Sequence, residues 1–221
     1  MSNKLTLSAS ERIKSLLDDS SFVEVGALVT ARTTDFNTKD YETPADGVVT
    51  GYGTIDGRLV YVYSQDASVL NGSVGEMHAK KITNLYDLAM KTGAPVIGLI
   101  DSAGLRLQEA TDALNAFGEI YLKQTMASGV IPQITAIFGS CGGGLAMIPT
   151  LTDFTFMEEK NAKLFVNSPN ALDENEISKC DTSAASFQSS EAGIVDVVAD
   201  EATIFAQIRE LVAMLPSNNE D

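Results

Sequence analysis

The sequence predicts an α/β domain in which buried strands alternate with helices. Residues 95–100 and 133–138 are compact apolar runs without alternation, which is typical of strands that are buried on both faces. Residues 76–92 form one apolar helical face that ends at Gly93, and residues 112–128 are expected to form a second helix. Strands that alternate with helices indicate crossover connections between parallel strands rather than a β-sandwich.

The N-terminal third adds a helix, a loop and a hairpin. Residues 10–17 have apolar positions at helical spacing behind Ser10, which predicts a helix capped by that serine. Residues 30–46 are polar and aperiodic and are expected to form a long, mobile surface loop. Asp56-Gly57 joins two runs of β-branched and aromatic residues, and this pattern is the strongest short-range signal of a β-hairpin. The two expected strands cover residues 47–55 and 58–64.

The C-terminal half continues the alternation after a glycine-rich turn at residues 139–144. Residues 167–190 are polar and weakly patterned. No repeat or linker interrupts the chain, so residues 1–221 are expected to form one domain with a core between about residues 10 and 215. The remaining expected elements are a short helix after the glycine-rich turn, strands at 154–157, 164–166 and 194–198, and a helix at 201–215 that Pro216 stops.

Composition argues against several classes of protein. Lys and Arg number 15 against 30 Asp and Glu, and the net charge of −15 argues against a nucleic-acid surface, which needs clustered cations. Cys141 and Cys180 are too few for a disulfide framework or a four-cysteine zinc site, and no other metal-ligand spacing is found. Residues 1–11 lack the apolar segment of a signal peptide, and no apolar run is long enough for a membrane span. We therefore expect a cytoplasmic protein without a metal site.

Three glycine-bearing turns are the best candidates for a functional site: residues 72–75, 101–104 and 139–144. The second and third each follow a buried strand and precede a helix, so their backbone N–H groups point beyond the strand end. Such turns can bind a phosphate or stabilise an oxyanion, because glycine lets a ligand approach the backbone closely. The phosphate alternative is weaker, since the third turn lacks the Gly-Lys-Ser/Thr ending of a nucleotide-binding loop. The simplest alternative is a set of tight turns that need positive φ.

No side chain supplies an obvious nucleophile or base. His78 is the only histidine, and without a carboxylate placed beside it no Ser-His-Asp triad can be assembled, so we expect a structural or supporting role for it. Cys141 precedes a helix, where the pKa of a thiol can fall, but a small buried thiol is the preferred interpretation. Oxyanion turns without a nucleophile favour a reaction in which the chain mainly stabilises an enolate.

Several stretches occur in the order typical of one known family. They include Asp46-Gly-Val-Val-Thr-Gly, Gly72-Ser-Val-Gly-Glu-Met-His, Asp101-Ser-Ala-Gly and Cys141-Gly-Gly-Gly, and they cover most of the chain up to Met157. These residues resemble the biotin-dependent carboxyltransferase family. That family includes the β subunits of propionyl-CoA and acetyl-CoA carboxylases and the carboxyltransferase subunits of sodium-pumping acyl-CoA decarboxylases.

The resemblance implies a crotonase-like ββα superhelix that binds an acyl-CoA substrate. In this family a Gly-Gly pair donates two N–H groups to the thioester carbonyl, and the pair falls on Gly143 and Gly144 here. The turn that contains Ala103 and Gly104 lines the same cleft by resemblance, and Gly142 is assigned to the substrate site with them. The α-proton is thought to leave through the ureido group of biotin, which would explain the missing base.

The resemblance also implies partners, because the chain corresponds to the N-terminal, acyl-CoA-binding half of the family's fold. We expect a separate C-terminal-half subunit, a biotin carboxyl carrier protein, and a trimer-based homo- or hetero-oligomer. The CoA phosphates need nearby cations on so acidic a chain. The candidates are Lys80, Lys81, Arg106 and Lys123, and the alternative for each is a solvated helix face.

Two alternatives to a catalytic subunit remain open. Residues 167–190 lack the family's Gly-Pro and Gly-Gly-Ala-x-x-His patterns, which favours a non-catalytic assembly subunit, whereas the intact Gly143-Gly144 pair opposes it. A stand-alone crotonase-type hydratase or hydrolase usually has a carboxylate at its site, and Glu109 is the candidate here. The motifs specify neither the acyl group nor the direction of carboxyl transfer.

Overall fold

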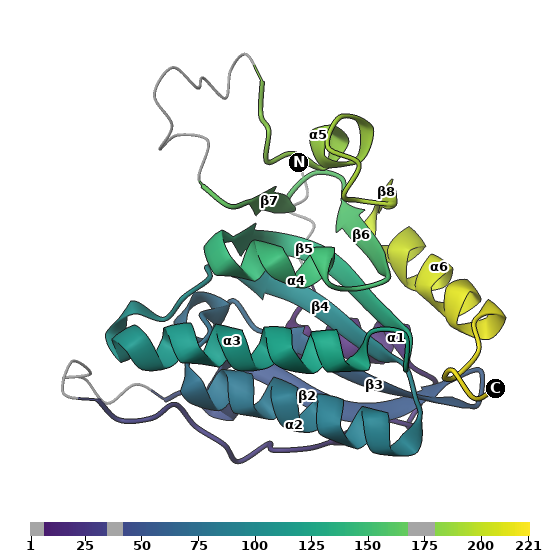
Figure 1. Cartoon of the computed structure of the whole chain (residues 1–221), viewed down its shortest axis with the longest axis horizontal. Helices are drawn as coiled ribbons and strands as arrows, with labels where there is room; N and C mark the ends of the chain where they lie inside the picture. The colour runs from purple at the N-terminus through teal and green to yellow at the C-terminus, as the bar shows by residue number, and fades with distance from the viewer. Residues whose placement is uncertain (1–6, 35–41, 168–179) are drawn as a thin grey trace.

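The computed structural model describes residues 7–34, 42–167 and 180–221 and arranges them around an eight-stranded sheet (Figure 1). Its order is β1-β2-β3-β4-β5-β6-β8, and β7 pairs with the last residues of β5. Strands β1 to β3 are antiparallel, and all the later pairs are parallel. The strands are β1 (Val23–Glu24), β2 (Val48–Ile55), β3 (Arg58–Gln65), β4 (Val96–Ser102), β5 (Gln133–Gly142), β6 (Phe154–Glu158), β7 (Lys163–Phe165) and β8 (Val197–Ala199).

The hairpin between β2 and β3 has the turn that its sequence predicts. Ile55 pairs directly with Arg58, which leaves a two-residue loop. Asp56 and Gly57 have φ values of 50° and 78°, and positive φ at both positions is the requirement of a type I′ turn. The local Asp-Gly signal therefore fixes the register of the strands that begin the sheet.

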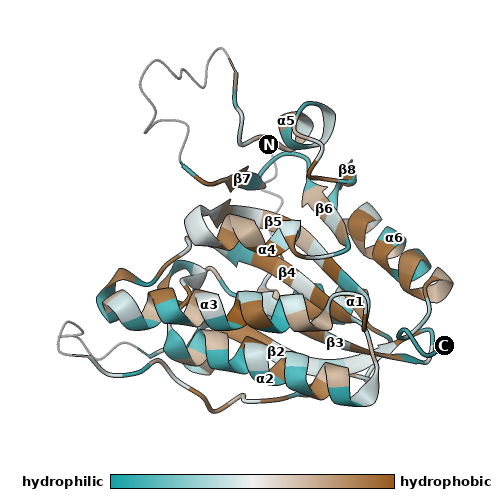
Figure 2. Cartoon of the chain, in the orientation of Figure 1, coloured by the Kyte–Doolittle hydropathy of each residue, from teal (hydrophilic) through white to brown (hydrophobic). Residues whose placement is uncertain are grey.

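Helices cover both faces of the sheet. Figure 1 shows α2 and α3 side by side in front of it and α1 behind it, and Figure 2 shows that apolar residues are concentrated in the central strands. Strands β4 and β5 are buried on both faces, as their unbroken apolar runs predict. Separate apolar clusters fill the space beneath α2 and α3 and beneath α1 and α6. The helices are α1 (Ala9–Leu16), α2 (Glu76–Thr92), α3 (Ala110–Ala127), α4 (Met147–Thr150), α5 (Ala185–Ser190) and α6 (Glu201–Met214).

Short 3-10 helices occupy the connections at which the candidate site lies. The first three precede β2, α2 and α3, respectively, and the fourth follows β5 and leads into α4. They are η1 (Pro44–Gly47), η2 (Leu70–Gly72), η3 (Leu107–Glu109) and η4 (Gly143–Ala146).

The structure corrects the cap predicted for the first helix. Helix α1 begins at Ala9, and its N-cap is Ser8 rather than Ser10. The Ser8 hydroxyl accepts the Glu11 N–H at 3.3 Å, and the Glu11 carboxylate accepts the Ser8 N–H at 2.8 Å. This reciprocal pair is a capping box, and the sequence Ser8-Ala-Ser-Glu11 contains it two residues before the expected start.

Three further expectations need correction. Residues 139–142 continue strand β5, so the glycine-rich turn is confined to η4. Residues 185–190 form α5, although this segment has little helical pattern. The strand expected at residues 194–198 is shorter and begins later, as β8 (Val197–Ala199), which pairs with β6. Residues 35–41 of the expected loop at 30–46, and residues 168–179, lie outside the described parts of the chain.

Among the described residues, none of the helices combines the length and the apolar character needed to cross a bilayer.

Replacing Ser8 tests the corrected start of α1. Ser8→Ala removes the hydroxyl that accepts the Glu11 N–H and donates to the Glu11 carboxylate, and we expect the free energy of unfolding to fall by about 1 kcal/mol. Ser10→Ala is the matched control, because Ser10 is exposed in the first turn of the helix and alanine is a better helix former. Urea denaturation measures both variants, and a larger loss in Ser10→Ala would restore Ser10 as the cap.

Candidate functional site

The three glycine-bearing turns predicted from the sequence meet at the carboxyl ends of β4 and β5. A side chain on Gly72 would overlap the carbonyl of Asp101, and the Ala103 N–H donates to Asn71 O at 2.9 Å. A side chain on Gly104 would lie 3.1 Å from the carbonyl oxygen of Gly142. The close approach of three backbone segments therefore explains why these turns contain glycine.

A short backbone ladder joins the first two turns. The Val74 N–H donates to Gly104 O at 2.8 Å, and the Arg106 N–H donates to Val74 O at 3.0 Å. Val74 and Leu105 accordingly form a parallel bridge. The start of α2 and the segment after β4 are held together, and this arrangement places Gly104 against Gly142.

The glycine step at Gly143 and Gly144 opens the connection after β5. Gly143 has a φ of 63°, and a side chain built there would meet no atom within 4 Å. Gly143 is half-buried and Gly144 is exposed, so both amides are close to solvent. Both residues belong to the first turn of η4, and the first N–H groups of a helix have no partner inside it. The residues that the sequence predicts as oxyanion donors therefore lie at an accessible end of β5.

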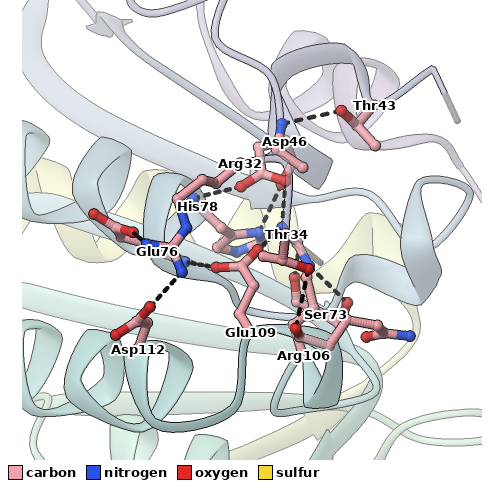
Figure 3. Close-up of polar contacts among 12 residues, drawn as sticks. Arg32, Thr34, Thr43, Asp46, Ser73, Glu76, His78, Arg106, Glu109 and Asp112 are labelled. Carbon is pink, nitrogen blue, oxygen red and sulfur yellow. Dashed lines mark hydrogen bonds and ion pairs between the residues drawn. The ribbon is translucent and has the colours of Figure 1, made fainter. Parts of the chain in front are cut away.

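Arg106 lies in a buried ion-pair network beside these turns (Figure 3). Its Nη1 is 2.6 Å from an Asp46 carboxylate oxygen and 2.9 Å from a Glu109 oxygen. Its Nη2 donates to Ser73 O at 2.7 Å, and its Nε is 3.3 Å from the Ser73 hydroxyl. Arg106 is only 2% exposed, so the structure corrects its expected role as a phosphate ligand. Both carboxylates that hold it are also buried, and they neutralise its charge.

Glu109 connects the network to the start of α2. Its second carboxylate oxygen accepts the Glu76 N–H at 2.6 Å, while its first oxygen pairs with Arg106. The carboxylate thus serves as an N-terminal cap for a neighbouring helix, where a negative charge is favoured. With both oxygens engaged and the side chain buried, Glu109 is poorly suited to be the acid or base of a hydratase.

His78 has the structural role expected for it. The ring is fully buried, its Nδ1 lies 2.9 Å from Asp46 O, and its Nε2 lies 3.2 Å from the Gln65 amide nitrogen. Burial, with the Arg106 charge as a second cause, lowers the pKa of His78 from 6.5 to about 3. The neutral ring therefore donates from Nδ1 to Asp46 and accepts from Gln65 at Nε2. Burial raises the pKa of the Asp46 carboxyl, against the opposing effect of Arg106.

The lysines expected to bind phosphate differ in their accessibility. Lys81 points inward and donates from Nζ to Ala45 O at 2.9 Å and to Val48 O, and burial lowers its pKa to about 8. We therefore remove Lys81 from the phosphate candidates. Lys80 is exposed beside Glu76, and Lys123 pairs with an Asp87 oxygen at 2.6 Å. Only these two remain accessible among the lysines proposed from the sequence.

Sequence reasoning missed an arginine and a tyrosine near the turns. Arg32 is partly exposed and pairs with Glu76 and Asp112, at the starts of α2 and α3 (Figure 3). The Tyr121 hydroxyl donates to Gly144 O. Neither residue belongs to a glycine turn or a recognisable motif, so no local signal indicates it. Cys141, by contrast, is the buried thiol that was expected, and burial raises its pKa.

The Arg106 network predicts a large difference between two arginine variants. Arg106→Leu leaves two buried carboxylates without a counter-charge, and we expect a loss of about 3–5 kcal/mol in the free energy of unfolding. Arg32→Leu removes partly exposed ion pairs and should cost about 1 kcal/mol or less. Chemical denaturation compares the two variants, and equal losses would contradict the assignment of Arg106 as the structural centre.

His78 predicts a pH dependence of stability with a defined sign. Below pH 6.5 the unfolded chain binds a proton at His78, whereas the folded protein binds it only near its lowered pKa of about 3. Stability is therefore lost as the pH falls through this window. Between pH 7 and pH 4.5 the residue should account for about 2–3 kcal/mol of that loss. Denaturation of His78→Gln should show a shallower decline, and an unchanged slope would show that the buried ring does not resist protonation.

The chain was compared with known proteins. Residues 3–221 match the family model described as carboxyl transferase domain. The chain is 46% identical over 217 residues to the methylmalonyl-CoA decarboxylase subunit alpha of Veillonella parvula, covering 96% of this chain and 43% of that protein. It is 42% identical to the biotin-dependent acetyl-/propionyl-coenzyme A carboxylase beta5 subunit of Mycobacterium tuberculosis, covering 96% and 40%. The chain thus spans less than half of the length of these relatives.

Solved structures give the same result for the fold. Transcarboxylase 12S, crystallised as a hexamer with hydrolyzed methylmalonyl-coenzyme A bound, matches with a TM-score of 0.92 and 37% identity, over 98% of this chain and 43% of that one. A malonate decarboxylase hetero-dimer from Pseudomonas matches with a TM-score of 0.76 and 25% identity, over 96% of this chain and 88% of that one. The expected crotonase-like α/β fold is confirmed. The chain belongs to the family of biotin-dependent acyl-CoA carboxyltransferases.

Proposed function

We propose that this chain binds an acyl-CoA thioester and stabilises its enolate while a carboxyl group moves to or from biotin. The observation that supports the proposal is the position of the glycine step, since Gly143 and Gly144, the proposed backbone donors, lie at the accessible end of β5. Ala103 is also exposed on the neighbouring turn, and Gly104 and Gly142 pack against one another behind the step. Family membership supports the substrate class, and the accessibility of the glycine step supports its assignment as the donor site.

In the proposed mechanism the thioester oxygen accepts hydrogen bonds from Gly143 and Gly144. These bonds withdraw electron density from the carbonyl carbon, so the pKa of the adjacent α-carbon falls. When the α-carbon loses a proton or a carboxyl group, the electron pair is delocalised onto the thioester oxygen, where the two N–H groups stabilise the charge. One donor to such an oxyanion lowers the activation barrier by about 3–4 kcal/mol. Biotin supplies or accepts the carboxyl group when its carrier delivers it to the site.

The side chains around the turns support a transferase over a hydratase. A hydratase needs a group that activates water, yet His78 is buried and neutral and Glu109 is held by Arg106 and by the start of α2. The enolate mechanism requires only neutral hydrogen-bond donors from this chain. The intact glycine step likewise supports a catalytic role over a purely structural assembly subunit.

A separate subunit is proposed to complete the active site. The chain covers 43% of the decarboxylase subunit that it resembles, so this match leaves more than half of that subunit's length unaccounted for. The malonate decarboxylase hetero-dimer offers a precedent in shape, because its matched chain is close to this one in length. We propose a hetero-oligomer containing a C-terminal-half subunit and a biotin carboxyl carrier protein. Lys80 is the exposed candidate for the CoA phosphates.

Replacing Gly143 tests the proposed function. Gly143→Ala places a methyl group in the open space in front of the step, and we expect at least about a tenfold weaker affinity for propionyl-CoA. In the complex with its partner, carboxyl transfer should fall by about a hundredfold or more. The thermal shift of the chain with propionyl-CoA measures binding, because a ligand of the native state raises its apparent stability.

Gly129→Ala is the matched control for this substitution. Gly129 has a φ of 72° and equally open surroundings, but it precedes β5 at the opposite end of the strand. Both variants carry the same left-handed backbone strain, which costs about 1–2 kcal/mol. If the two variants bound propionyl-CoA equally well, the glycine step would not be the thioester site.

A further inference from the structure

Tyr121 on α3 contacts the glycine step from the side of the helix layer. Its hydroxyl donates to the carbonyl oxygen of Gly144, which also accepts the Met147 N–H. The carbonyl therefore has two donors, one from a side chain and one from the backbone. Because Tyr121 lies within an 18-residue helix that packs against α2 and α4, the hydroxyl ties a short irregular segment to a rigid element.

The fit between Tyr121 and Gly144 is tight. A side chain on Gly144 would lie 3.0 Å from the Tyr121 hydroxyl oxygen and 3.6 Å from the Phe117 ring. The Tyr121 ring is stacked on Phe117, with centroids 6.0 Å apart and an interplanar angle of 27°. Burial raises the pKa of Tyr121, so its hydroxyl keeps its proton and remains a donor. The tyrosine is thus held in place by its ring and bonded through its hydroxyl.

We propose that Tyr121 is a positioning residue for the oxyanion donors Gly143 and Gly144. Two consecutive glycines have wide conformational freedom, and the four-residue helix η4 contributes little rigidity of its own. The Tyr121 bond holds the peptide plane between Gly144 and Leu145 and so anchors the C-terminal side of the Gly143-Gly144 step. Positioned donors stabilise a developing charge without reorganising at the moment of reaction. This inference rests on the proposed function.

The test separates recognition of the thioester carbonyl from binding of the rest of the ligand. Propionyl-CoA is compared with S-propyl-CoA, a thioether of the same length that lacks the carbonyl group. We expect the wild-type chain to bind propionyl-CoA about tenfold more tightly than the thioether, since two hydrogen bonds are at stake. In Tyr121→Phe this preference should shrink about three- to fivefold, while the affinity for S-propyl-CoA stays unchanged. Isothermal titration measures all four affinities.

Tyr61→Phe is the matched control. Its hydroxyl accepts a bond from Thr92 at 3.3 Å, and the residue is buried on β3, outside the glycine turns. This variant should retain the wild-type preference for the thioester. A Tyr121→Phe protein that also retains the preference overturns the positioning role and leaves the proposed function intact. A wild-type chain with no preference refutes the carbonyl-binding assignment and the positioning role with it.

A double-mutant cycle tests the contact itself without a ligand. Gly144 is not among the glycines with positive φ, so alanine is permitted there by the backbone and is opposed by the Tyr121 hydroxyl. Gly144→Ala should lower the urea midpoint in the wild-type background, and the loss should be at least halved in the Tyr121→Phe background. Equal losses in both backgrounds would show that the hydroxyl does not press on Gly144, which overturns the proposed contact.

Discussion

The buried pairing of Arg106 with Asp46 and Glu109 is the constraint on which the site depends. Asp46 lies ahead of β2, Glu109 lies ahead of α3, and Ser73, which accepts from the same guanidinium, lies ahead of α2. One side chain therefore joins three connections that are distant in sequence. Buried charges of this kind are stable only together, so the connections cannot separate without exposing an unpaired ion. The network reaches the glycine step through the turn at residues 101–104, which places Gly104 against Gly142.

The parts of the fold that the sequence predicted correctly are those with short-range causes. Buried parallel strands need continuous apolar runs, and β4 and β5 have them. The β2–β3 hairpin follows from Asp56-Gly57, because an I′ turn needs two residues that tolerate positive φ. Where two local signals compete, the choice failed: Ser8 and Ser10 both precede apolar positions, and the contact with Glu11 decides for Ser8. Helix α5 was missed because its stability comes from packing against β7 and β8 rather than from its own pattern.

The glycine turns predicted from the sequence lie together in the structure, whereas two of the predicted phosphate-binding cations are buried. Parallel strands bring their carboxyl ends to one edge of a sheet, so turns after β4 and β5 must be neighbours. No comparable rule predicts where the charged group of a lysine or arginine lies, because the sequence gives its charge but not the direction of its side chain. Arg106 and Lys81 turn inward to partners in the segment around Asp46, which lies 60 residues before Arg106. Tyr121 and Gly144 are 23 residues apart in the sequence, and no sequence motif predicts the hydrogen bond between them.

Backbone donors suit a chain of this charge. With a net charge of −15, the protein as a whole repels an anionic ligand. Local cations attract such a ligand only over short distances, because the Debye length is about 8 Å at physiological salt. Amide N–H groups are neutral and do not titrate, so the donors at Gly143 and Gly144 keep their strength while neighbouring carboxylates change protonation. The ionisable groups beside the turns are themselves paired, as Arg106 is, or held neutral, as His78 is. The proposed oxyanion site is thus uncharged, and in the proposed mechanism the charge that moves belongs to the substrate.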